Sequence, residues 1–149
     1  MKKIHSFEIN HDEHGVGFYL STIQGDIYTY DLRFVTPNGG EYLPNPTMHT
    51  IEHLFATVSR NGSLKDKVIY FGPMGCRTGF YFLLRDIDYK SALAYTISVV
   101  EKCLTIDDIP GNSRRECGNY LEHDFVDSKV KLSKYLKVLQ KIAESSQKE

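Results

Sequence analysis

Residues 49–53 read His-Thr-Ile-Glu-His, an H-x-x-E-H pattern whose residue types and spacing point to metal chemistry. In a helix, His49 and His53 lie one turn apart on the same face, so both imidazoles reach a single metal ion. Glu52 borders that face, where a carboxylate can take a proton from a bound molecule without being a ligand. The pattern therefore predicts a divalent metal site with an acid/base group beside it. The plainer alternative is a pair of surface histidines on an amphipathic helix.

A metal held by two helical histidines needs a further ligand, because catalytic tetrahedral sites usually combine three protein ligands with one open position. Cys103 lies in an apolar segment, which favours a buried, unreactive thiol. Cys76 and Cys117 both lie in irregular segments, and spacing does not rank one above the other as a ligand. The remaining candidates are the carboxylates and four histidines: His5, His11, His14 and His123.

The first half of the chain predicts strands on either side of the helix that carries this pattern. Residues 17–23 and 27–35 are expected to form two strands joined by a turn at residues 25–26, because apolar and polar residues alternate in the second of them. One face of that strand is expected to be core, with Arg33 on the other. A helix is expected to run from an N-cap at Thr47 to about Arg60, followed by strands over residues 68–71 and 78–84.

Two more helices are predicted in the second half, over residues 88–104 and about 127–143, separated by an irregular segment at 106–119. The last helix is expected to bury an apolar side that consists of Val130, Tyr135, Val138, Leu139 and Ile142. The resulting element order, β-β-α-β-β-α-α, predicts an α+β fold with a mainly antiparallel β-sheet and helices packed on one face. We expect a single domain over residues 1–143 and a polar C-terminal tail over residues 144–149.

Composition excludes several classes of function. The 149 residues are 41% hydrophobic and 25% charged, which is typical of one globular domain. Eighteen Lys and Arg residues against nineteen Asp and Glu residues argue against nucleic acid as a partner, because phosphate binding needs a basic excess. No apolar run approaches the roughly 18 residues of a membrane span. The odd number of three cysteines fits a reducing cytoplasm better than a disulfide framework.

Three further segments give the chain a more specific signature. Residues 49–56 read His-Thr-Ile-Glu-His-Leu-Phe-Ala, residues 72–81 read Gly-Pro-Met-Gly-Cys-Arg-Thr-Gly-Phe-Tyr, and Cys117-Gly118 is followed by His123-Asp124. In this order and at these distances, they resemble the S-ribosylhomocysteine lyase family, also called LuxS or autoinducer-2 synthesis protein. The resemblance extends to residues 6–11 and 30–38 and so spans nearly the whole chain. The segment at 72–81 is far more specific than the H-x-x-E-H pattern.

The resemblance implies a role for each matching residue. His49, His53 and Cys117 are implied as metal ligands, and Glu52 and Cys76 as the acid/base pair. The residues implied to contact substrate are Ser6, His11 and Arg33. The implied metal is ferrous iron, with zinc or cobalt able to substitute, and no organic cofactor is expected. The family further implies a homodimer with its sites at the subunit interface.

The implied reaction cleaves S-ribosylhomocysteine to homocysteine and 4,5-dihydroxy-2,3-pentanedione, the precursor of autoinducer-2. The sugar carbonyl must move from C1 to C3 before the thioether on C5 can leave by β-elimination. A ligand set of imidazoles and a thiolate suits Fe(II) or Zn better than Mg or Ca. Where the family commonly has an acidic residue and a serine before Pro-Met-Gly, this chain has Tyr70-Phe71-Gly72, so contacts with the amino-acid end of the substrate are expected to differ.

Two other classes of function compete with a lyase. H-x-x-E-H is also the inverzincin signature of metallopeptidases; in that interpretation Glu52 activates water and a downstream carboxylate such as Glu122 is the third ligand. A non-catalytic, metal-stabilised binding domain is the other class, and it leaves Glu52 and Cys76 without a task. An enzyme that keeps the fold but has lost turnover is a further alternative.

Overall fold

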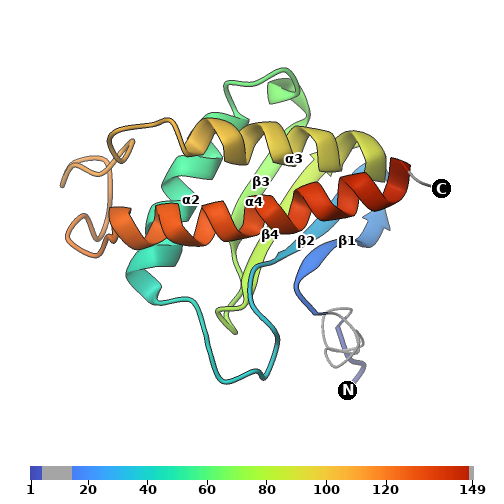
Figure 1. Cartoon of the computed structure of the whole chain (residues 1–149), viewed down its shortest axis with the longest axis horizontal. Helices are drawn as coiled ribbons and strands as arrows, with labels where there is room; N and C mark the ends of the chain where they lie inside the picture. The colour runs from blue at the N-terminus through green and yellow to red at the C-terminus, as the bar shows by residue number, and fades with distance from the viewer. Residues whose placement is uncertain (5–14, 148–149) are drawn as a thin grey trace.

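The computed structural model describes residues 1–4 and 15–147 of the chain. Within these residues the elements follow the predicted β-β-α-β-β-α-α order, with one short 3-10 helix added between the helix at Asn45–Ser59 and the strand that follows it (Figure 1). They are β1 (Gly17–Gln24), β2 (Ile27–Arg33), α2 (Asn45–Ser59), η1 (Lys65–Lys67), β3 (Val68–Pro73), β4 (Gly79–Arg85), α3 (Tyr89–Cys103) and α4 (Phe125–Gln147). None of the described helices has both the length and the apolar character that crossing a bilayer requires.

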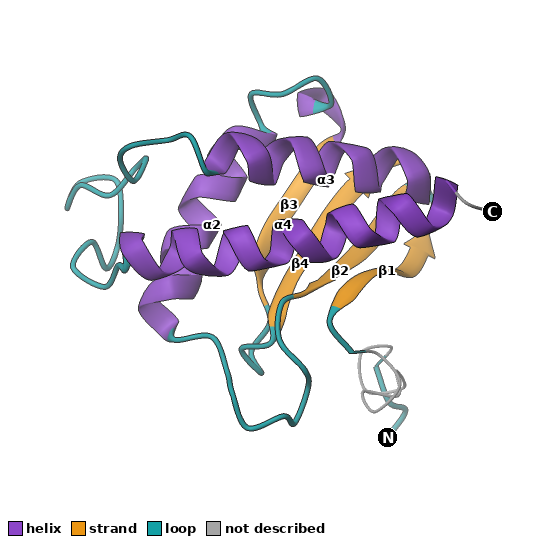
Figure 2. Cartoon of the chain, viewed as in Figure 1, coloured by secondary structure: helices purple, strands orange, loops and turns teal. Residues whose placement is uncertain are grey.

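The described strands form one antiparallel sheet in the order β1-β2-β4-β3. Helices α2, α3 and α4 lie against one face of this sheet (Figure 2), which confirms the predicted α+β fold. The alternation in β2 places Tyr30 and Leu32 on the covered face, opposite Phe82 and Phe80 of β4, and all four side chains are fully buried. Burial of these large side chains supplies most of the sheet's stabilisation, because apolar area removed from water is the main favourable term in folding.

The other face of β2 differs from expectation, because its last residues are buried as well. Asp31 is 1% exposed and Arg33 is 2% exposed, so the strand carries an ion pair where the sequence predicts only a face away from the core. Arg33 pairs with Gly79 at the start of β4, where an added Cβ would collide with the Leu32 carbonyl oxygen. Glycine therefore lets the two strands approach closely, and this brings Arg33 and Thr78 together.

Helix α2 begins earlier than predicted, and Thr47 is not its N-cap. The helix starts at Asn45, with Pro44 at the cap and Pro46 in the first turn, a position where the missing proline N–H costs no helical hydrogen bond. Thr47 is instead buried, and its hydroxyl donates to Asp127 of α4 over 2.6 Å. This residue therefore joins two helices. The predicted apolar side, which includes Met48, Ile51, Leu54 and Phe55, is buried as expected.

Helix α4 is longer than predicted at both ends. It runs from Phe125 to Gln147, so helix continues into the segment expected to be a tail. Val130, expected on the apolar side, is 49% exposed, and Leu132 takes the corresponding place in the core. Tyr135 and Leu139 are buried as predicted. A helix whose first turn starts two residues earlier is the usual error of prediction at an element boundary.

Candidate metal centre

Helix α2 presents His49 and His53 to one point in space. Their Nε2 atoms lie 3.1 Å apart, and the ring planes are tilted by 82° to each other with centroids 4.7 Å apart. Both side chains are half-buried. One helical turn therefore brings two imidazole nitrogens within reach of a single ion, the arrangement that the i, i+4 spacing indicates.

Cys117 reaches the same point from the irregular segment between α3 and α4. Its Sγ lies 3.3 Å from His49 Nε2 and 3.7 Å from His53 Nε2. A local turn fixes the sulfur there, because the Cys117 backbone N–H donates to the Ser113 carbonyl over 2.9 Å. Of the two cysteines that spacing could not rank, Cys117 is the one that lies with the histidines.

His123 is a fourth member of this group; it is among the candidate ligands named from the sequence, but the family resemblance gives it no role. Its Nε2 lies 4.0 Å from Cys117 Sγ, and its ring stacks on His49 with centroids 4.0 Å apart and 18° between planes. The donor atoms of His49, His53, Cys117 and His123 all lie within 4.8 Å of one another; we call these residues the donor cluster. The signal that could have found His123 is its position six residues after Cys117, within the segment that resembles the family.

Backbone carbonyls aim the two helical histidines. His49 Nδ1 lies 2.8 Å from the Glu122 carbonyl oxygen, and His53 Nδ1 lies 2.8 Å from the Pro110 carbonyl oxygen. A carbonyl only accepts, so each Nδ1–H donates and each Nε2 keeps its lone pair toward the cluster. Such hydrogen bonds on the far nitrogen are typical of metal-binding histidines.

The spacing of three donors fits a metal ion. A tetrahedral ion with bonds of about 2.0–2.1 Å to nitrogen and about 2.3 Å to sulfur separates its ligands by about 3.3 Å for N···N and about 3.6 Å for N···S. The observed separations among His49, His53 and Cys117 are 3.1, 3.3 and 3.7 Å.

Burial lowers the pKa of His123, and the neighbouring His49 and His53 lower it further. A lowered pKa favours the uncharged form of the His123 imidazole, which suits a position beside a cation.

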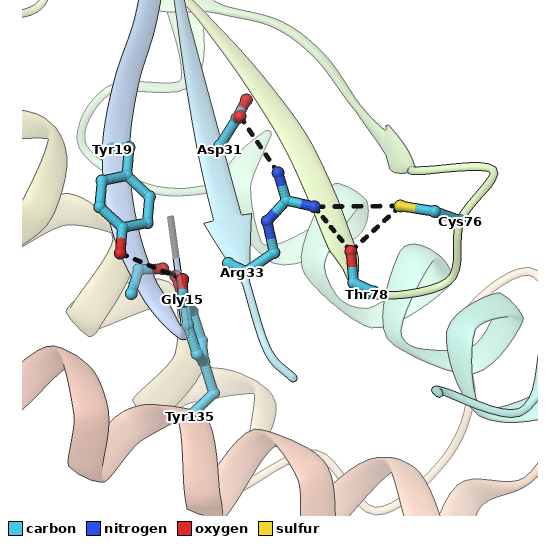
Figure 3. A network of polar contacts seen from close by, with 8 residues as sticks. Gly15, Tyr19, Asp31, Arg33, Cys76, Thr78 and Tyr135 are labelled. Atoms are coloured by element: carbon cyan, nitrogen blue, oxygen red, sulfur yellow. Dashed lines mark hydrogen bonds and ion pairs between the residues drawn. The ribbon is translucent and has the colours of Figure 1, made fainter. Parts of the chain in front are cut away.

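Cys76 lies in a separate network at the end of the sheet, which Figure 3 shows from close by. Its Sγ is 3.1 Å from Thr78 Oγ1 and 3.9 Å from Arg33 Nη1. Arg33 Nη1 donates to Thr78 Oγ1 over 2.6 Å, and Nη2 lies 3.6 Å from Asp31 Oδ2. We call Asp31, Arg33, Cys76 and Thr78 the Arg33 network. A fixed guanidinium beside the sulfur interacts favourably with negative charge there.

A cavity of about 450 Å³ lies between helix α2 and the turn that carries Cys76. His49 and Glu52 of α2 line one side, and Gly75 and Arg77, the residues on either side of Cys76, line another. Cys76 itself is exposed. The helix that carries the candidate acid/base Glu52 and the turn that carries Cys76 therefore face a common space of a size suited to a small molecule.

The remaining residues to which the sequence analysis assigns a role divide into three groups. Ser6 and His11 lie outside the described residues. Arg33 is described and is buried in its network rather than open to solvent. Cys103 is fully buried, and burial raises the pKa of its thiol to about 12, in agreement with the predicted packing role.

The geometry does not favour the peptidase interpretation. Its proposed third ligand, Glu122, uses its side chain to accept a hydrogen bond from Asn119 Nδ2 over 3.0 Å. Only the Glu122 backbone carbonyl contacts His49. Among the described residues, the group of donors at this point contains Cys117 and His123 and no carboxylate.

Comparison with known proteins gives a consistent result. Residues 4–147 match the family model described as S-Ribosylhomocysteinase (LuxS). The S-ribosylhomocysteine lyase of Borreliella burgdorferi strain ZS7 is 41% identical over 155 residues, covering 99% of this chain and 99% of its own. The enzyme of that name from Clostridium beijerinckii is 43% identical over 144 residues, covering 91% and 90%. That from Porphyromonas gingivalis is 40% identical over 152 residues, covering 96% and 94%.

Proposed function

The chain belongs to the S-ribosylhomocysteinase (LuxS) family, and from that premise we propose that it is an S-ribosylhomocysteine lyase, a carbon-sulfur lyase. The observation that carries the proposal is the convergence of His49, His53 and Cys117 on one point, beside a cavity that Glu52 lines. The products are homocysteine and 4,5-dihydroxy-2,3-pentanedione. Neither the donor set nor the comparisons support the metallopeptidase alternative.

The residues that would hold the metal are His49, His53 and Cys117. Ferrous iron is the proposed ion, with zinc or cobalt as substitutes, because imidazole and thiolate donors suit these metals. When bound, the ion supplies Lewis-acid stabilisation of negative charge on the sugar oxygens. The protein's part is to keep three lone pairs aimed at the ion, through the Nδ1 hydrogen bonds of His49 and His53 and the turn that holds Cys117.

Glu52 and Cys76 are the proposed proton-transfer pair. Moving the carbonyl from C1 to C3 requires removal of a proton from the carbon next to each carbonyl, and its return to the neighbouring carbon. Glu52 lines the cavity from α2, and Gly75 and Arg77, the neighbours of Cys76, line it from a different element, an arrangement that suits proton transfers at successive carbons. Elimination then removes a proton from C4 and breaks the bond from C5 to sulfur, and the sulfur leaves as the homocysteine thiol after taking up a proton.

Ser6, His11 and Arg33 are proposed to bind or orient the substrate. The support for Arg33 is its hydrogen bond to Thr78 and its proximity to Cys76, which place its positive charge beside the proton-transfer group.

We propose further that the enzyme works in the cytoplasm as a homodimer with its sites at the interface, and that residues 1–143 form its single domain. Its product then feeds autoinducer-2 formation, while homocysteine returns to the activated methyl cycle.

One assay tests the activity directly. The iron-loaded protein is incubated anaerobically with S-ribosylhomocysteine, and the released thiol is titrated. We expect release of one thiol per substrate consumed, with none from protein treated with a chelator. Absence of homocysteine above background would overturn the lyase proposal, and Glu52-dependent cleavage of a peptide library would support the peptidase in its place.

A further inference from the structure

His123 lies in the donor cluster, yet the proposed reaction gives it no task. Its ring is half-buried, stacks on His49 and directs Nε2 toward Cys117 Sγ at 4.0 Å. Its Nδ1 lies 2.9 Å from Oγ1 of Thr50, the residue that follows His49 in α2. The contact at Nδ1 fixes the ring, and Nε2 is left facing the donor cluster, where it can contact a bound molecule.

The contacts of the Thr50 hydroxyl favour the tautomer of His123 that carries its proton on Nδ1. This hydroxyl has one hydrogen, which it donates to the Pro46 carbonyl over 3.1 Å. The Asp124 backbone N–H donates to the same oxygen over 3.0 Å. Toward His123 the hydroxyl therefore acts as an acceptor, so His123 Nδ1–H donates and Nε2 presents a lone pair to the cluster.

Two geometrical features distinguish His123 from the other three donors. Its 4.0 Å separation from Cys117 Sγ exceeds the roughly 3.6 Å expected for nitrogen and sulfur on one tetrahedral ion. An imidazole lone pair lies in the plane of its ring, and the planes of His49 and His123 are stacked with only 18° between them. Two rings stacked face to face do not both aim in-plane lone pairs at one ion. His49 is therefore the ligand of this pair, and His123 is its neighbour.

We propose that His123 Nε2 is the hydrogen-bond acceptor for the hydroxyl group that takes the open fourth position beside His49, His53 and Cys117. This inference rests on the proposed lyase function: the group is a sugar hydroxyl of S-ribosylhomocysteine in the complex, and a water molecule without it. A hydroxyl on a cation is a strong donor and needs an acceptor. The Nε2 lone pairs of His49 and His53 converge on one point together with the sulfur of Cys117, so among the histidines of the donor cluster only His123 has an Nε2 lone pair that is not used there.

The consequence is that His123 orients the sugar. A hydroxyl fixed by both an ion and an acceptor has few directions left for its carbon, and this restricts how the carbon-bound protons can lie relative to Glu52 and Cys76. A precise orientation of this kind contributes to the rate without proton transfer by His123 itself.

The test compares two near-isosteric variants of His123 in a Glu52→Gln background, which is expected to bind substrate without turning it over. In His123→Asn the amide nitrogen retains the donor to Thr50 but nothing replaces Nε2. In His123→Gln the amide oxygen lies near the Nε2 position while the Thr50 contact is lost. Each protein is loaded with cobalt, its metal affinity is measured by competition with a chromophoric chelator, and S-ribosylhomocysteine binding is followed by the change in the cobalt spectrum.

We expect unchanged metal affinity and an unchanged thiolate-to-cobalt band in both variants. Substrate dissociation constants should rise about twofold to tenfold in His123→Asn, the usual effect of one hydrogen bond, and less in His123→Gln. A large loss of metal affinity in either variant would show that His123 is a ligand, and tighter binding by Asn than by Gln would show that it only anchors Thr50. Equal substrate binding in all three proteins would overturn the role of His123 alone. No spectral change with His123 intact would overturn the lyase proposal and this inference with it.

Discussion

Around His49 and His53 the chain aims two imidazoles with backbone carbonyls, whereas around Cys76 it buries a charged guanidinium against a carboxylate. The donor cluster is thus built to receive a positive charge, and the Arg33 network already contains one. The cavity of about 450 Å³ lies between helix α2 and the turn that carries Cys76. In the proposed reaction the ion would stabilise negative charge on the substrate, and the Arg33 guanidinium would stabilise negative charge on the Cys76 sulfur beside it.

Removing the sulfur from the donor cluster is the strongest test of this contrast. Cys117→Ala deletes one of three ligands, so we expect it to lose its metal on dialysis, with affinity reduced by more than about a hundredfold. The measurement is metal content by elemental analysis, together with loss of the thiolate-to-cobalt band. A Cys117→Ala protein that kept stoichiometric metal would mean that the cluster holds its ion by other donors.

Cys76→Ala is the matched change in the other region. It should keep its metal, because Cys76 Sγ contacts Thr78 and Arg33 rather than the donor cluster. Homocysteine release should fall by about 10²–10⁴-fold, the usual effect of losing a general acid/base. Metal content and turnover are measured on the same preparation. If this variant came out metal-free and Cys117→Ala did not, the roles of the two cysteines would have to be exchanged.

Arg33→Met tests whether the positive charge of the Arg33 network is structural as well as functional. The Asp31 carboxylate is 1% exposed, so removing its cation should lower the free energy of unfolding by about 3–5 kcal/mol. Urea denaturation measures this. The double variant Asp31→Asn/Arg33→Met should recover part of the stability and none of the turnover. Full activity in the double variant would show that the charge has no part in the reaction.

The smallest expected effect is at Thr47, which joins α2 to α4. Thr47→Val removes the hydrogen bond to Asp127 and should cost about 0.5–1.5 kcal/mol, with metal content unchanged. The Thr47 hydroxyl lowers the pKa of Asp127 in the folded state, with Lys131 lowering it further. The contribution of Asp127 to stability is therefore present above the carboxyl's ordinary pKa and is lost as pH falls through the lowered one. The difference in stability between wild type and Thr47→Val should shrink on acidification, and a constant difference would contradict this cause.

Local patterns predicted the fold well, since each depended on neighbours in sequence. Alternation located β2, and the i, i+4 spacing of His49 and His53 was sufficient to indicate their common face. The start of α2 was predicted too late, with Thr47 as the N-cap. Pro46 gave no clear signal, because proline is compatible both with an extended segment before a helix and with a first helical turn. The burial of Arg33 escaped prediction because it depends on the close approach of β4 at Gly79.

The parts of the site that could not be predicted come from the irregular segment between α3 and α4. Periodicity says nothing about where such a segment folds back, so the meeting of Cys117 with α2 required the structure or the family resemblance. The same is true of the Pro110 and Glu122 carbonyls that orient the helical histidines. His123 was among the candidate ligands, but only its stacking on His49 and its bond to Thr50 indicate what it contacts.

These carbonyl contacts have a thermodynamic consequence. Pro110, Cys117 and Glu122 all belong to the one segment that joins α3 to α4, and each holds or completes the donor cluster. An ion that binds only the closed arrangement stabilises it by mass action, by about 2.7 kcal/mol at a free concentration one hundred times its dissociation constant. Metal therefore acts as a reversible cross-link between this segment and α2. In the metal-free protein, residues 106–124 should exchange their amide hydrogens faster and be cut first by proteases, while the sheet stays protected.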